Sequence, residues 1–160
     1  TLSDWADHLT TIFPEARLKK FIEMRGADAG QWHRLCALPA FWVGICYDQG
    51  SLDAAWDIVK NWDENDRENL RIAAAEDGLK GSVGSISLID LAKEAVRVSE
   101  SGLKKRAQAS SNGLHSDESL FLDSLKENIE KRKSSADELL EKYHGSWNKD
   151  LTKVYEEYSY

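Results

Sequence analysis

The sequence has few of the residues that stabilise small secreted proteins or anchor membrane proteins. It contains two cysteines and two prolines in 160 residues, too few cysteines for a disulfide framework. Its longest apolar run, CALPAFWVGICY, is too short to span a bilayer and is interrupted by a proline. No cleavable signal segment opens the chain. We therefore expect a cytoplasmic protein without a membrane partner, whose thiols Cys36 and Cys46 are reduced and buried.

The charge pattern also lacks a basic block. Twenty-one lysines and arginines stand against twenty-eight acidic residues, which gives a net charge of −7. Because no run of like charge is long enough to form a polyanion-binding patch, we expect no nucleic acid as a partner. The length suits one domain, although it also suits a piece of a larger enzyme.

One short run, RLKKFIEMRGAD at residues 17–28, alternates apolar and charged side chains and ends at a glycine. Alternation is typical of a strand, whose successive side chains point to opposite faces. Leu18, Ile22 and Met24 share a face that we expect to join a core. The opposite face carries Arg17, Lys19, Phe21, Glu23 and Arg25. No second strand of comparable quality is present, so this strand is expected to pair in a homodimer or with a preceding stretch of polypeptide.

The remainder of the chain predicts helices. Residues 32–47 are apolar nearly all round, as in a buried helix bent at Pro39. A later amphipathic helix begins near Leu88 and is expected to end near Gly102, and a capping box of Ser135 with Glu138 starts another. We expect a mainly α fold of about six helices with one or two β-strands near the N-terminus. Residues 1–30 would complete a catalytic sheet, and residues 31–160 would form a helical C-terminal region.

Glu23 and Arg25 are the first candidates for chemistry. A carboxylate beside an arginine on a strand is more often half of a structural ion pair than a catalytic group. The alternative is a metal site, because Mg²⁺ uses one or two carboxylates and keeps substrate phosphates as its other ligands. A neighbouring arginine would then neutralise a phosphate or a carboxylate.

Several stretches resemble the glutamate-cysteine ligases of the plant and proteobacterial type. The most specific is HLTTIFPEARLKKFIEMRGADAGQWHRLCALPAFWVGICYD at residues 8–48, followed by DLAKEAVRVSESGLKKRA and ADELLEKYHGSWNKDLTKVYEEYSY. The resemblance implies the C-terminal part of such an enzyme, whose strands belong to the antiparallel sheet of a glutamine synthetase-like fold. It also implies that the N-terminal part of the same enzyme supplies most of the nucleotide-binding and metal-binding sheet.

The activity implied by this resemblance is the joining of the γ-carboxylate of glutamate to cysteine, using ATP and Mg²⁺, through γ-glutamyl phosphate. This is the first step of glutathione synthesis, and the isolated chain is expected to be inactive. The EMR run matches an acidic, apolar, arginine pattern of the family. By that match Glu23 would be a Mg²⁺ ligand, and Arg25 would be a catalytic residue that also binds substrate.

Five further residues are candidates for substrate binding, namely Arg17, Thr11, Phe13, Trp32 and Arg34. For the first three, the alternative is a tight connection whose threonines cap backbone groups. For Trp32 and Arg34, the alternative is packing at the start of a helix. Two other functions stay open for the chain, a non-catalytic helical interaction module and a related ATP-dependent carboxylate-amine ligase.

Overall fold

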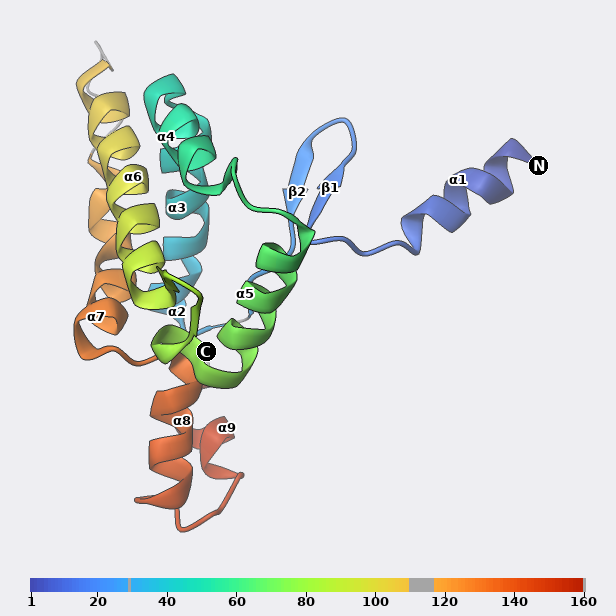
Figure 1. Cartoon of the computed structure of the whole chain (residues 1–160). Helices are drawn as coiled ribbons and strands as arrows, with labels where there is room; N and C mark the ends of the chain where they lie inside the picture. Colours follow the sequence, from blue (N-terminus) through green and yellow to red (C-terminus); the bar gives the residue numbers. More distant parts are fainter. Residues whose placement is uncertain (29, 110–116, 160) are drawn as a thin grey trace. The chain divides into compact units, whose positions relative to one another are not determined.

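The computed structural model describes residues 1–28, 30–109 and 117–159 of the chain (Figure 1). It divides into two compact units, Thr1–Gly30 and Gln31–Tyr160. The described elements are mainly helical with short antiparallel strand pairs, one of them near the N-terminus. The predicted fold class is therefore confirmed.

The first unit contains the helix α1 (Leu2–Thr10) and a β-hairpin of β1 (Ala16–Leu18) and β2 (Ile22–Met24). Our expectation of one continuous strand without a partner in this chain was wrong. Residues 19–21 turn the chain back, and the amide of Lys19 donates to the carbonyl of Phe21 at 2.8 Å. Alternation is the same for one long strand and for two short ones, so the pattern did not reveal the turn.

Most of the apolar face of this hairpin is left exposed by the described residues, with Met24 half-buried. The exposed fractions of Leu18 and Ile22 are 83% and 65%. The expectation that this face joins a core is therefore not met by the described residues.

The second unit is helical. In order it contains α2 (Trp32–Leu35), α3 (Ala37–Cys46), α4 (Gln49–Val59), α5 (Glu64–Asp77), the 3-10 turn η1 (Gly78–Lys80), β3 (Ser82–Val83), β4 (Ile86–Ser87), α6 (Leu88–Ala109), the 3-10 turn η2 (Glu118–Leu122), α7 (Asp123–Lys131), α8 (Ser135–His144) and α9 (Lys153–Glu157). The core lies between α3, α6 and η2, where Ala40, Val96, Leu103 and Leu122 are buried together.

The packing of α3 against α6 depends on small residues. A Cβ on Gly102 would stand 1.8 Å from the carbonyl oxygen of Gly44, and one on Gly44 would stand 2.2 Å from the carbonyl oxygen of Ser99. The Ser99 hydroxyl donates to the carbonyl of Phe41 at 2.9 Å. Gly102 therefore permits a close helix crossing. Our expectation that the helix ends near Gly102 was wrong, because α6 continues to Ala109.

The long apolar stretch also differs from its prediction. The helix is interrupted at Cys36, before Pro39, and Pro39 lies in the first turn of α3. A helix tolerates proline at that position because its first amides have no hydrogen-bond partner within the helix. Neither thiol is fully buried, since Cys36 is half-buried and Cys46 is exposed, so the expectation of buried thiols was wrong.

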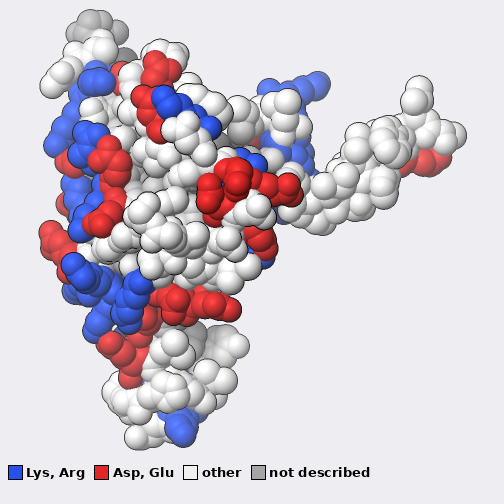
Figure 2. Space-filling model, viewed as in Figure 1, with Lys and Arg blue, Asp and Glu red and all other residues white. Residues whose placement is uncertain are grey.

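The start of α8, the membrane-helix expectation and the surface charges can also be compared with the structure. The capping box at the start of α8 uses Ser134 and Asp137, one residue earlier than predicted. None of the helices in the described part of the chain is long and apolar enough to cross a membrane. In the view of Figure 2, acidic and basic groups alternate along α6, consistent with ion pairs such as Lys93 with Asp90 and Lys104 with Glu100.

Candidate functional site

The hairpin of the first unit brings three of the predicted site residues together. In its register Arg17 lies directly opposite Glu23, and Arg25 follows Glu23 by two residues, so all three side chains share one face. The sequence predicted this shared face. The direct pairing of Arg17 with Glu23 is a product of the turn at residues 19–21.

Glu23 is surrounded by cations. Its Oε2 accepts from Nε of Arg17 at 2.8 Å and lies 2.7 Å from Nη2 of the same residue. Its Oε1 accepts from Nη1 of Arg25 at 2.9 Å, and Nζ of Lys19 lies 3.8 Å from Oε2. The hydrogen bond from Arg17 and the charges of all three cations lower the pKa of the Glu23 carboxyl, although partial burial opposes them. Glu23 is therefore ionised at neutral pH.

Phe13 supports both guanidinium groups. The guanidinium carbon of Arg25 lies 4.9 Å from the centre of the Phe13 ring, and that of Arg17 lies 5.8 Å from it. These distances are within the range of cation–π attraction. Arg17 also donates through Nη1 to the carbonyls of Thr10 at 3.2 Å and Ile12 at 3.5 Å. The connection between α1 and β1 is thus hydrogen-bonded to the hairpin face that carries Arg17, Glu23 and Arg25, which we call the charged face.

Thr11 has a role within the backbone. It is the capping residue directly after the last residue of α1, and its hydroxyl donates to the carbonyl of His8 at 2.7 Å. This contact corresponds to the alternative in which the threonines cap backbone groups. Substrate binding by Thr11 stays a prediction.

Trp32 and Arg34 belong to the second unit, and their side chains differ in exposure. Trp32 is the first residue of α2 and is 72% exposed, so it does not pack into the core of the described residues. The Arg34 side chain is only 17% exposed. Substrate contact by Trp32 stays a prediction as well.

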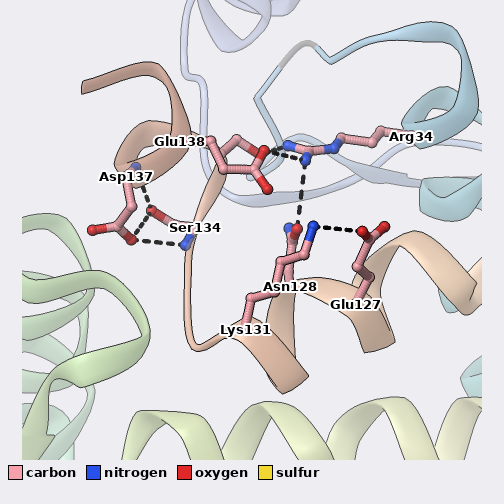
Figure 3. Close-up of polar contacts among 8 residues, drawn as sticks. Arg34, Glu127, Asn128, Lys131, Ser134, Asp137 and Glu138 are labelled. Atoms are coloured by element: carbon pink, nitrogen blue, oxygen red, sulfur yellow. Dashed lines mark hydrogen bonds and ion pairs between the residues drawn. The ribbon is translucent and has the colours of Figure 1, made fainter. Parts of the chain in front are cut away.

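Arg34 joins α2 to α7 and α8 (Figure 3). Its Nη2 donates to Oε2 of Glu138 at 2.7 Å and to Oδ1 of Asn128 at 3.4 Å, and its Nη1 donates to the hydroxyl of Ser135. A guanidinium held by three side chains serves to connect helices. The contacts of Arg34 therefore correspond to the packing alternative.

Sequence reasoning missed Glu15. The amide of Arg25 donates to the carbonyl of Glu15 at 2.8 Å, which extends the hairpin by one pair. The Glu15 carboxylate lies against Gly26, where a Cβ would stand 2.3 Å from Oε2. The glycine that follows the EMR run thus makes room for a second carboxylate. Recognising the hairpin in the sequence would have placed residue 15 opposite residue 25.

Glu23 can supply one ligand to a metal ion. A carboxylate offers about four lone-pair sites, and among the described residues Arg25 is the only donor to Oε1. An ionised oxygen with a lone pair that accepts no hydrogen bond can coordinate Mg²⁺, which usually takes one or two carboxylates beside substrate phosphates. In the part of the chain that the structure describes, no three His, Cys, Asp or Glu side chains are grouped to hold a metal. Further ligands would have to come from outside the described residues.

Comparison with known proteins identifies the family. Residues 1–157 match the family described as Glutamate-cysteine ligase family 2 (GCS2). The chain belongs to this family of glutamate-cysteine ligases. The resemblance inferred from the EMR run and its surroundings is thereby confirmed.

Relatives similar to this chain include glutamate-cysteine ligases of plants. The chain is 43% identical over 160 residues to the chloroplastic glutamate-cysteine ligase of Solanum lycopersicum and 44% identical over 160 residues to that of Nicotiana tabacum, covering all of the chain and 29% of each relative. It is 42% identical over 158 residues to the chloroplastic enzyme of Arabidopsis thaliana, covering 99% of the chain and 29% of that relative. The chain therefore spans less than a third of the length of these relatives.

Proposed function

We propose that this chain is the C-terminal part of a glutamate-cysteine ligase. The complete enzyme would phosphorylate the γ-carboxylate of glutamate with ATP and transfer the resulting γ-glutamyl group to the amine of cysteine, the first step of glutathione synthesis. The observation that carries the proposal is the charged hairpin face. Glu23 and Arg25 project from it with Arg17, in a chain of this ligase family.

Arg25 would act as the catalytic cation. Phosphoryl transfer and acyl phosphate formation concentrate negative charge on oxygen atoms, and fixed positive groups stabilise that charge. The Arg25 guanidinium is held by Glu23 on one side and by the Phe13 ring on another. It would bind a phosphoryl oxygen or the glutamate carboxylate without needing to reorient.

Glu23 would be the Mg²⁺ ligand that this chain contributes. When bound, Mg²⁺ would neutralise charge on the ATP phosphates. The bonds of Glu23 to Arg17 and Arg25 would keep Oε1 in a fixed position.

The remaining part of the enzyme is the partner that the hairpin requires. An isolated two-stranded hairpin is at best marginally stable and has two unpaired edges. We propose that residues 1–30 complete a catalytic sheet with strands of the N-terminal part and that the 160-residue chain alone is inactive. A homodimer of the complete enzyme is proposed too, and its mass in solution would test it.

For the compartment we propose the cytoplasm. The alternative is a plastid, because the plant relatives are named chloroplastic. A fluorescent fusion of the complete gene product would distinguish them by its location.

The central test uses the complete gene product and measures γ-glutamylcysteine and ADP formed from glutamate, cysteine and ATP. We expect Glu23→Gln and Arg25→Met each to lower kcat by at least about 100-fold, with the melting temperature nearly unchanged. Glu68→Gln is the matched control, because Glu68 forms an exposed pair with Arg71 on α5. Wild-type turnover in Glu23→Gln would contradict the ligand role.

The same assay addresses the two alternative functions. A different amine acceptor would appear as ADP formation that another amine supports better than cysteine does. A helical interaction module would show no ADP formation with any amine. Either result would replace the proposed function.

A further inference from the structure

The two arginines of the charged face differ in exposure and in how many of their hydrogen-bond donors contact other groups of the protein. The Arg17 side chain is 15% exposed, whereas that of Arg25 is 32% exposed. Both contact the same carboxylate of Glu23, and both lie over the ring of Phe13. From the sequence, both were candidates for substrate binding.

The donors of Arg17 are directed at the protein. A guanidinium has five N–H groups. In Arg17, Nε donates to Oε2 of Glu23 at 2.8 Å, and Nη2 forms an ion pair with the same oxygen at 2.7 Å. Its Nη1 points to the carbonyls of Thr10 and Ile12. All three nitrogens of this side chain are therefore engaged.

Arg25 keeps most of its donors for a ligand. Within the described residues, the contact of its guanidinium with a hydrogen-bond acceptor is the one from Nη1 to Oε1 of Glu23 at 2.9 Å. Its Nε and Nη2 have no acceptor there. Two adjacent nitrogens of a guanidinium bind phosphate or carboxylate oxygens in a bidentate fashion.

We propose that Arg17 is a positioning residue and that Arg25 is the arginine of this pair that binds the anionic substrate group. Arg17 acts on Arg25 by two routes. It fixes the Glu23 carboxylate that holds Nη1 of Arg25, and it fixes the segment that carries the Phe13 ring beneath Arg25. This inference rests on the proposed ligase function, and it reassigns Arg17 from substrate binding.

The test compares Arg17→Lys with Arg25→Lys in the complete gene product, with Arg71→Lys on exposed α5 as the control. Lysine keeps the charge but cannot bond Glu23 and two carbonyls together. We expect Arg25→Lys to raise KM for glutamate or ATP by at least about tenfold, because a bidentate contact is lost. We expect Arg17→Lys to lower kcat by about tenfold or more, because the catalytic groups shift, while both KM values change less than about threefold.

The outcomes separate this inference from the proposed function. An increase in KM with unchanged kcat in Arg17→Lys would show that Arg17 binds substrate. Wild-type kinetics in that variant would show that Arg17 does not position Arg25. Either result overturns the inference while wild-type ligation still supports the function. Absence of ligation by the wild-type enzyme would overturn both.

A second variant covers the case in which Arg17→Lys fails to fold. Phe13→Leu keeps an apolar side chain beneath Arg25 but removes the aromatic ring. We expect it to lower kcat severalfold with KM for glutamate and ATP unchanged. Unchanged kcat in Phe13→Leu would overturn the route through the ring, and raised KM alone would show that Phe13 itself contacts substrate.

Discussion

The two units of this chain differ in where their side chains find partners. No described residue of 1–30 is buried, although this unit holds the charged face around Glu23. Among the described residues, every buried apolar side chain lies in 31–160, and a cluster of them lies where α3, α6 and η2 meet. Candidate chemistry and core packing are thus carried by different parts of the sequence.

This difference shows how each unit can be stable. Ion pairs that stay partly solvated contribute little free energy, so the charged face cannot hold the hairpin together by itself. The second unit buries apolar side chains such as Leu103 and Leu122 completely, each of which contributes about 2 kcal/mol. We therefore expect the helical unit of the 160-residue chain to determine its measured stability.

The largest effect should come from the crossing of α3 and α6. A valine at Gly102 would place its Cβ on the carbonyl of Gly44, so the helices would have to separate. We expect Gly102→Val to destabilise the 160-residue chain by about 3 kcal/mol or more, measured by urea unfolding. Gly50→Ala is the control, because its Cβ would meet the end of the flexible Lys105 side chain at 3.1 Å and the Asp48 carboxylate at an ordinary contact distance of 3.4 Å. A wild-type unfolding midpoint for Gly102→Val would refute the packing described here.

A smaller effect is expected at Arg34. Arg34→Met would remove the guanidinium that bonds Glu138 and leave this carboxylate unpaired at a helix junction. We expect a loss of about 2 kcal/mol, with part of it recovered in Arg34→Met/Glu138→Gln. In the complete enzyme, kcat and KM per folded molecule should stay near wild type. Raised KM with unchanged stability would instead show that substrate binding extends into the second unit.

The start of α8 provides a prediction on pH. The Ser134 hydroxyl and amide bond the Asp137 carboxylate and, with Lys80, lower its pKa from 3.8 to about 2. Because the folded pKa lies below the unfolded one, the ionised carboxylate stabilises the fold above about pH 4. This contribution disappears as the pH falls through about 2.

Comparing wild type with Asp137→Asn isolates this carboxylate from the others. We expect a difference in unfolding free energy of about 1 kcal/mol at pH 7, the usual contribution of a helix cap, and a much smaller one as the pH falls through about 2. Thermal unfolding at several pH values would measure it. A difference that persists unchanged at pH 2 would exclude the carboxylate charge as its source.

The smallest effect should follow from removing residues 1–30. Since none of the described residues of this segment is buried, we expect residues 31–160 alone to unfold cooperatively within about 1 kcal/mol of the whole chain. Circular dichroism during urea unfolding would measure it. A fragment without a cooperative transition would mean that the two units share their stability.

Local patterns in the sequence predicted many of the helices and misplaced some of their ends. Two adjacent serines at 134 and 135 both suit a helix cap, and the bond to Asp137 selected the first. Gly102 suited a helix end by its type, yet it lies within α6 because Gly44 approaches it from another helix. A glycine that ends a helix and one that admits a neighbour look the same in a sequence.

Residue identity and local spacing were enough to establish the family and the charges that share the hairpin face. Which of these charges meet depends on the three-dimensional path of the backbone. Arg17 and Glu23 are six positions apart and are joined by a turn, and Arg34 and Glu138 are 104 positions apart and are joined by helix packing. Partners of this kind depend on how the backbone returns through space, and neither composition nor periodicity specifies that path.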